Sequence, residues 1–178
     1  MEYNVEKKCF ELHGEIFATM RHADGSVETR NYKNIIVDVA SEQMAEWAIA
    51  QNSVEFPRVD GIRVLAVGTG AVGWDLQNPP PATAAQTQLE NELQRNTFES
   101  VNYVTPGTFV PSLTRTNIVD YITTYTETQA VGPLVEMGLF GGTGATSPSS
   151  GTMINYKTFP VWNKSSTSTL TIVWRLTF

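Results

Sequence analysis

Glu136 is the residue of this 178-residue chain whose surroundings most clearly require a chemical partner. It lies within residues 135–140, an otherwise apolar run that is typical of a buried strand. Burying a carboxylate costs several kcal/mol unless the group is paired or hydrogen-bonded. The sequence therefore predicts a structural ion pair rather than an active-site acid. Arg175 is the expected partner, and Arg95 and Arg115 are the other arginines that could serve.

Residues that could perform catalysis or bind a metal ion are otherwise few and scattered. The histidines are His13 and His22, and Cys9 is the single cysteine, so neither an intrachain disulfide nor a cysteine-based zinc site can form. No serine lies in a Gly-x-Ser-x-Gly motif, and the remaining carboxylates fall on different predicted elements. We therefore expect no enzymatic activity, no metal site and no cofactor. An enzyme that uses Glu136 with a histidine stays as a third hypothesis.

A glycine motif matches the dinucleotide-binding fingerprint in its letters but not in its context. Gly68, Gly70 and Gly73 have the G-x-G-x-x-G spacing and follow a predicted strand. A pyrophosphate would need the N-terminus of a helix directly after the glycines, whereas three prolines follow at 79–81. We interpret the glycines as a turn that uses positive φ angles.

Three aromatic residues in predicted loops and strand ends suggest an alternative function. Trp74, Tyr156 and Trp162 could form a stacking platform for a sugar, as in carbohydrate-binding modules. We interpret Trp74 and Trp162 instead as packing against the sheet or a neighbouring subunit, because large aromatic side chains dominate contact energies. A glycan partner therefore stays open as the second alternative.

Composition excludes several classes of partner. The net charge is −6 and the pI about 4.9, and the basic residues are scattered, which argues against nucleic-acid binding. No run approaches the roughly 18 apolar residues of a membrane span. The N-terminus lacks a signal-peptide pattern, so we expect synthesis in a cytoplasm. Charged residues make up 17% of the chain, below the usual ~25%, which favours a surface partly covered by other proteins.

The last nine residues show the clearest strand pattern. An Asp24-Gly25 turn predicts a β-hairpin nearer the N-terminus, and the nearly continuous apolar run within 60–67 predicts a central strand. In the C-terminal strand, large apolar side chains alternate with mostly polar ones, which is typical of a strand with one buried face. These apolar residues are Leu170, Ile172, Trp174, Leu176 and Phe178.

Two segments have helical spacing, and the rest of the pattern predicts strands. Asp38 can cap a helix that runs to about residue 51, and residues 82–95 predict a second helix. We expect a single domain over residues 1–178, with a mostly β, β-sandwich-like fold and two short helices. Its prominent loops are 68–82 and 141–151, and the second is predicted to be mobile. The predicted strands are 10–20, 27–37, 60–67, 98–105, 113–125, 135–140, 153–161 and 169–178.

Several short segments follow one another in a recognisable order and spacing: 34–37, 62–70, 89–95, 136–140, 151–153 with Phe159 and Lys164, and 170–178. Together they resemble a group of tailed-bacteriophage structural proteins of the tail and tail-fibre type. The resemblance runs from about Gly14 to Phe178. It implies a β-rich assembly module without enzymatic activity, located in a virion that is assembled in the cytoplasm of the bacterial host. Its partners would be copies of itself and other virion proteins.

The resemblance also sets an expectation about position in the particle. Fibre-type members often carry this module within a longer chain, whereas this sequence stops at Phe178, so we expect a stand-alone building block. We expect it in the neck, tail or baseplate, with decoration of the head (capsid) as the alternative. Symmetric homo-oligomers are the usual way in which such subunits assemble. The candidate interface residues are Trp74, Pro79, Pro80, Pro81, Gly142, Ser147 and Trp162.

Overall fold

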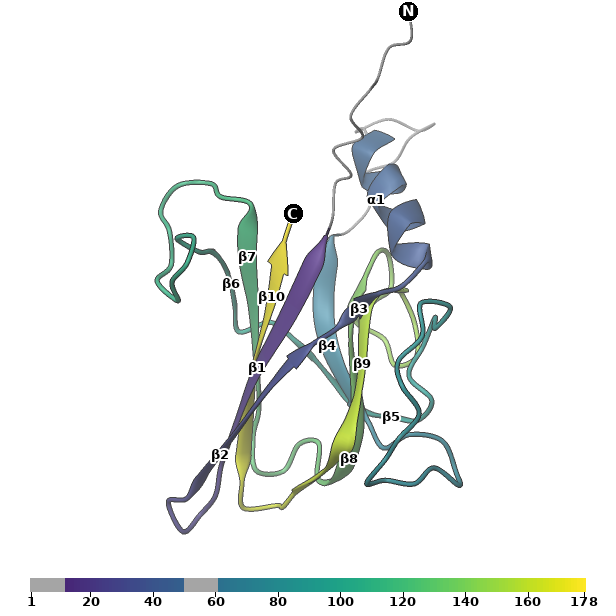
Figure 1. Ribbon diagram of the computed structural model, residues 1–178, viewed down its shortest axis with the longest axis vertical. Helices are drawn as coiled ribbons and strands as arrows, with labels where there is room; N and C mark the ends of the chain where they lie inside the picture. Colours follow the sequence, from purple (N-terminus) through teal and green to yellow (C-terminus); the bar gives the residue numbers. More distant parts are fainter. Residues whose placement is uncertain (1–11, 50–60) are drawn as a thin grey trace, which may run out of the picture.

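The computed structural model describes residues 12–49 and 61–178. In this part of the chain ten strands and one helix form a mostly β fold, with two five-stranded antiparallel sheets (Figure 1). The mostly β fold predicted from the alternating apolar pattern is therefore confirmed. Cys9 and the ends of the predicted first strand and first helix lie outside the described residues.

The first sheet is built around the C-terminal strand. The apolar residues predicted to share one face of that strand, from Leu170 to Leu176, are at most 1% exposed. The hairpin predicted at Asp24-Gly25 joins the first two strands, and Gly25 has a φ of 85°. The strand order is β2-β1-β10-β7-β6. The bounds are β1 His13–Arg21, β2 Val27–Lys33, β6 Ser100–Tyr103, β7 Ile118–Tyr125 and β10 Thr169–Thr177.

The second sheet carries the longest strands and the most apolar one. The run predicted as a central strand is β4, which lies between two neighbours, and Val64 to Val67 in it are at most 1% exposed. The strand order is β3-β9-β8-β4-β5. The bounds are β3 Ile35–Ile36, β4 Ile62–Gly68, β5 Glu92–Thr97, β8 Gly132–Gly141 and β9 Thr152–Lys164.

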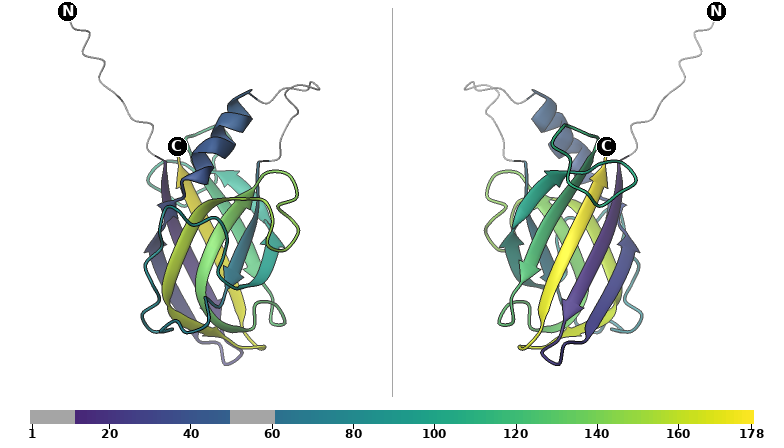
Figure 2. Two further views of the ribbon diagram at one scale, coloured as in Figure 1. Left: turned by 90° about the vertical axis from the view of Figure 1, so that its right-hand side faces the viewer. Right: turned by 90° about the vertical axis from the view of Figure 1, so that its left-hand side faces the viewer.

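The chain crosses from one sheet to the other at both edges. At one edge β2 continues into β3 through Asn34, and at the other β5 continues into β6 through residues 98 and 99. The two views in Figure 2 show the sheets from opposite sides of the molecule. Between the sheets, the Tyr125 hydroxyl donates to the Leu65 carbonyl at 2.7 Å. Residues from both sheets form one buried apolar cluster.

Only one of the two predicted helices forms within the described residues. The first is α1, Val39–Ile49, which packs against β9. The second, expected over 82–95, is wrong: residues 82–91 have no regular structure, and β5 follows at the sheet edge. Most apolar residues of that segment are alanines, and Ala84 and Ala85 are exposed. A helix there would have buried little surface, whereas an extended strand pairs with the edge of β4.

Candidate functional site

The buried charged side chains of the described residues define the chemistry of the molecule, and Glu136 is the most enclosed of them. It is 0% exposed in β8. Its Oε1 accepts the backbone N–H groups of Asn91 at 2.9 Å and Gly70 at 3.1 Å. Its Oε2 accepts the N–H of Glu90 at 3.0 Å and the hydroxyl of Tyr156 at 2.8 Å. A carboxylate has about four acceptor positions, so these four donors leave none for a substrate.

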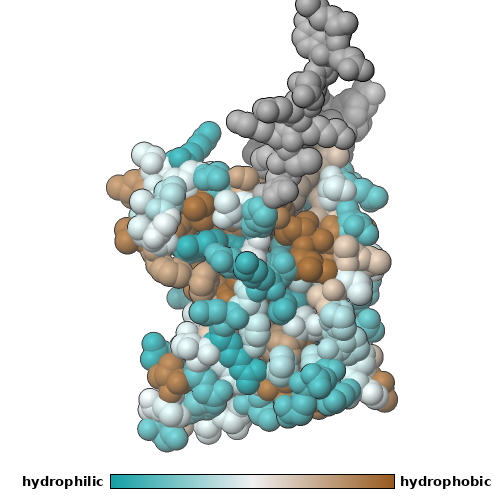
Figure 3. Space-filling view, viewed as in Figure 1, coloured by the Kyte–Doolittle hydropathy of each residue, from teal (hydrophilic) through white to brown (hydrophobic). Residues whose placement is uncertain are grey.

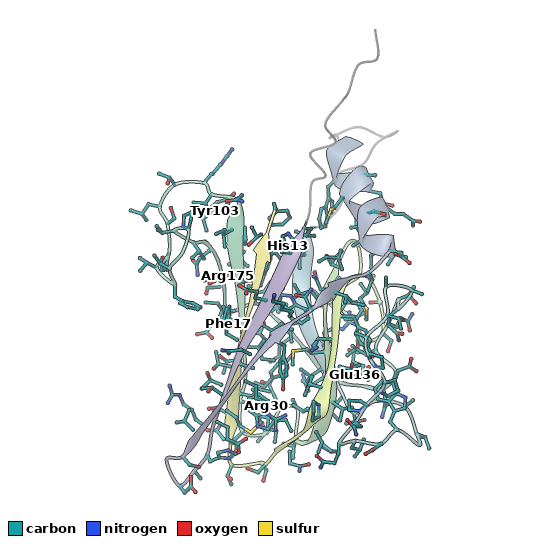
Figure 4. All side chains as sticks on the ribbon, in the orientation of Figure 1. His13, Phe17, Arg30, Tyr103, Glu136 and Arg175 are labelled. Carbon is teal, nitrogen blue, oxygen red and sulfur yellow. The ribbon has the colours of Figure 1, made fainter. Side chains whose placement is uncertain are left out.

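The predicted ion pair between Glu136 and Arg175 is wrong, because both residues have other partners. Arg175 Nε and Nη2 donate to the two carboxylate oxygens of Asp120 at 2.7 and 2.8 Å. Figure 4 shows Glu136 on the β8–β9 side of the molecule and Arg175 on the opposite side, at β10. The burial requirement for Glu136 was inferred correctly, but neutral N–H and O–H donors meet it instead of a cation.

Glu136 fixes the long segment between β4 and β5 onto the second sheet. This segment, residues 69–91, runs across the outer face of β8 and β9 in the left view of Figure 2. The glycines of the G-x-G-x-x-G motif make the close approach possible. A Cβ on Gly68 would lie 2.5 Å from Glu136 Oε1, and Gly70 has a φ of 73°. The interpretation of the motif as a turn with positive φ is confirmed for Gly70 and Gly73.

Tyr156 keeps its proton as the fourth donor to Glu136. Burial raises the pKa of this phenol, and the nearby Glu136 carboxylate raises it further. Both effects disfavour a phenolate, because burial penalises the charged form and a second negative charge would lie beside the first. The hydroxyl therefore donates a hydrogen bond over the whole physiological pH range, which makes the pair a permanent structural contact.

A second buried centre lies on the outer face of the first sheet. The side chains of Asp120 and Arg175, 8% and 9% exposed, form a two-bond ion pair across β7 and β10. Arg175 also donates to the Thr108 carbonyl at 3.0 Å. Its guanidinium lies 4.5 Å from the ring centroid of Phe109 and 5.6 Å from that of Phe17, and these two rings meet edge to face at 4.9 Å. Together the contacts hold the chain between β6 and β7 against the sheet.

The same stretch of chain carries most of the exposed large apolar side chains. Of nine such residues among those described, five lie in residues 101–113, here called the 101–113 segment. Figure 3 shows apolar surface at the left of the molecule, where Figure 1 places the chain between β6 and β7. The exposed residues are Val101 at 51%, Tyr103 at 41%, Phe109 at 64%, Val110 at 61% and Leu113 at 106%.

A third charged side chain holds the glycine-serine loop after β8. Arg95 donates to the carbonyls of Ala145 and Ser150 at 2.5 and 2.7 Å, and forms a two-bond ion pair with Glu92. The loop expected to be a free, mobile segment is therefore tied to β5. Of the interface candidates in it, Gly142 is buried with a φ of 77°, and Ser147 is exposed.

The aromatic residues proposed as a sugar platform do not share a surface. Tyr156 is 2% exposed and engages Glu136. Trp162 is 3% exposed, its Nε1 donates to Glu28 at 2.7 Å, and the Arg30 guanidinium lies 4.7 Å from its ring centroid. Trp162 is therefore an interior residue and does not present the exposed surface that was predicted for an interface. Trp74 is half-buried, and its ring lies beside Gly70.

The three candidate interface prolines lie on a fixed loop, here called the proline loop. Pro79 is half-buried, and Pro80 and Pro81 are exposed. The Thr158 hydroxyl donates to the Pro80 carbonyl at 2.8 Å, and the Val161 N–H donates to the Leu76 carbonyl at 2.7 Å. The loop is thereby attached to β9 at two points, and its prolines are presented outward on a rigid backbone.

The histidines have structural contacts. His22 bonds the Ser168 hydroxyl through Nδ1 and Glu28 through Nε2, each at 2.9 Å. His13 is exposed at the start of β1. Among the described residues, no group of three or more His, Cys, Asp or Glu side chains is placed to hold a metal ion.

Sequence reasoning missed the Asp120–Arg175 centre and the 101–113 segment. The alternation in the C-terminal strand places Arg175 on the face opposite Trp174, which indicates that its side chain points outward.

No family model matches the chain, and no curated protein matches it. No helix in residues 12–49 or 61–178 is long and apolar enough to cross a membrane.

Proposed function

We propose that this chain is a non-enzymatic structural component of a tailed-bacteriophage virion. It assembles through protein–protein contacts with copies of itself and other virion proteins. Its position is the neck, tail or baseplate, with decoration of the head as the alternative. The proposal rests on the ordered set of segments that resemble phage structural proteins and on the surface properties described above.

We also propose that the two sheets form a β-sandwich. One apolar cluster draws on both sheets, and the chain passes between them at both edges. The Tyr125 to Leu65 hydrogen bond joins β7 of one sheet to β4 of the other. Such a frame is stiff, because side chains from the two inner faces interdigitate in a common core. A stiff frame suits a subunit that must keep its shape in a particle.

The observation that carries the assembly role is the 101–113 segment. Fully burying a large apolar side chain contributes roughly 1.5–3 kcal/mol, yet Phe109, Val110 and Leu113 are each more than 60% exposed. Exposed apolar residues gathered on one stretch of a soluble protein mark an interaction site. The Arg175 contacts hold the backbone in place, so little conformational entropy is lost when a partner covers it.

The use of the buried charges supports a non-enzymatic role. Glu136, Arg95 and Arg175 each hold a different connecting segment against a sheet. Their polar atoms are engaged by the protein itself, whereas a catalytic acid or base must have a reacting group within hydrogen-bond reach. The aromatic platform on which the carbohydrate-binding alternative rests does not form, because Tyr156 and Trp162 lie in the interior.

Two measurements test the proposal. Light scattering coupled to size-exclusion chromatography, over a series of concentrations, should give a mass that is a multiple of the 19.6 kDa chain. Mass spectrometry of particles purified from the bacterial strain that carries the gene should find peptides of this chain. A monomer at every concentration, together with particles that lack these peptides, would remove the proposal.

A further inference from the structure

A cleft with an unusual charge lies between the proline loop and β9, away from the 101–113 segment. Its volume is about 390 Å³, within the range of small-molecule sites. Lys33 and Lys157 bring positive charge to it, and Asn78 brings an amide. Apolar surface comes from proline rings and from Phe159. None of the lining residues, all within the described part of the chain, is acidic, although the chain as a whole carries a net charge of −6.

Lys157 differs from every comparable cation in the described residues. It is half-buried, and its Nζ lies 5.5 Å from the centroid of the Tyr32 ring. Desolvation without an acceptor disfavours the ammonium form, and burial accordingly lowers the pKa of Lys157. The other buried or half-buried basic side chains all bond to an oxygen atom; they are His22, Arg30, Arg95, Lys164 and Arg175.

The walls of the cleft are already in place without a ligand. The bonds from Thr158 to Pro80 and from Val161 to Leu76 fix the proline loop beside β9. Tyr32 and Phe159 stack at 5.4 Å across the join between the sheets, beneath Lys157. A ligand would therefore meet a preformed site and lose little binding energy to reorganisation.

We propose that this cleft binds a small anion, a carboxylate or a phosphate, carried on a sugar-sized ring. The ammonium groups of Lys33 and Lys157 bind the anionic group, and the Asn78 amide bonds a ring hydroxyl. The C–H face of the ring packs on the prolines. This activity is separate from assembly, because it uses neither β6 nor the loop that follows it.

The test is an NMR titration of the whole protein with glucuronate, glucose 6-phosphate and glucose. These probes share a ring and differ in the anionic group. We expect saturable shifts of the Lys157 and Thr158 amides and of the Asn78 side-chain amide with at least one anion, and none with glucose. A response to one anion alone identifies the preferred group. Equal responses to glucose, or no saturable shift with either anion, would overturn the proposal.

Matched variants locate the binding. Lys157→Gln should weaken binding of the preferred anion by about tenfold or more, because it removes the half-buried charge. Lys33→Gln should weaken this binding less. Arg115→Gln removes an exposed cation outside the cleft and should leave binding unchanged. The amide spectrum of each variant shows whether it is folded. If folded Lys157→Gln binds as tightly as the native chain, the site is not this cleft.

Discussion

At the scale of single residues, the buried carboxylate of Glu136 is stabilised by neutral donors. Three backbone N–H groups and a phenol surround it. Hydrogen bonds to a charged group are worth more than those between neutral groups, about 1.5–3 kcal/mol each. Three of the four donors belong to one distant segment, so this side chain decides where residues 69–91 lie.

Glu136→Gln should destabilise the fold. The amide keeps one acceptor oxygen and places an NH₂ group against N–H donors, so at least one buried donor loses its partner at a cost of about 1–3 kcal/mol. Urea unfolding followed by tryptophan fluorescence measures the loss. The control is Glu127→Gln, which changes an exposed carboxylate. Equal stability of the two variants would show that the four-donor arrangement contributes nothing.

Buried tyrosines should make stability fall in alkaline solution. Burial raises the pKa of Tyr121 to about 12 and also raises the pKa values of Tyr125 and Tyr156. A raised folded-state pKa gives stability that is complete below the unfolded pKa of about 10 and is lost as the pH rises towards the folded value. Each phenol should lower the free energy of unfolding by about 1.4 kcal/mol per pH unit in that window.

Tyrosinate absorbance measures this directly. The three tyrosines that are buried in the described part of the chain should ionise only when it unfolds, so the absorbance should rise in two stages. Denaturant midpoints at pH 9, 10 and 11, treated as approximate settings around the unfolded pKa, should fall over the same window. A single-stage titration of all tyrosines near pH 10 would contradict the burial of these phenols.

Part of the Glu136 site could be predicted from the sequence. The apolar run around Glu136 predicted that the carboxylate is buried and needs partners. The partners could not be predicted, because amide N–H groups are common to all residues and the segment that supplies them was expected to be a helix. The outward position of Arg175 was predictable, because this residue alternates with the buried residues of the C-terminal strand.

Among the described elements, three long connections are each tied to a strand by one charged side chain. Glu136 of β8 holds residues 69–91, Arg175 of β10 holds the β6–β7 connection, and Arg95 of β5 holds the loop after β8. Loops normally lie on the surface with few buried contacts. Here the strands position them, which keeps the outer faces of both sheets in defined shapes.

Arg95→Ala should release the loop after β8 without unfolding the sheets. The variant loses the bonds to Ala145 and Ser150 and leaves Glu92 without its cation. Amide hydrogen exchange should rise by about tenfold or more within residues 142–150, the change expected when roughly 1.4 kcal/mol of local stability is lost. Exchange in β4 and β8 should change little. Unchanged exchange in the loop would show that Arg95 does not hold it.

Strands with regular alternation were predictable, and β5 was not. The alternation of β10 and the Asp-Gly turn between β1 and β2 identified both elements, because burial on one face imposes the pattern. In β5 only Leu93 is a large apolar residue, and it is 41% exposed. The strand exists because it pairs with the edge of β4, and such tertiary pairing leaves no local signal.

The whole molecule combines a buried frame with one exposed apolar segment, which we propose as its assembly surface. The core and the three anchoring side chains form the frame, and the 101–113 segment supplies the surface. The β1–β2 hairpin lies at the opposite end of the long axis in Figure 1. A head-to-tail or symmetric assembly that uses the 101–113 segment would leave that hairpin free for a second contact.

The most direct test compares the mass of the native chain with that of a surface variant by analytical ultracentrifugation. The double variant Val110→Ser, Leu113→Ser removes two exposed apolar side chains and touches no buried anchor. The control Val27→Ser changes an exposed valine, 47% accessible, at the other end of the molecule. We expect the native chain and the control to form an assembly and the double variant to be a folded monomer. A native chain that stays monomeric, or a double variant that assembles equally well, would contradict it.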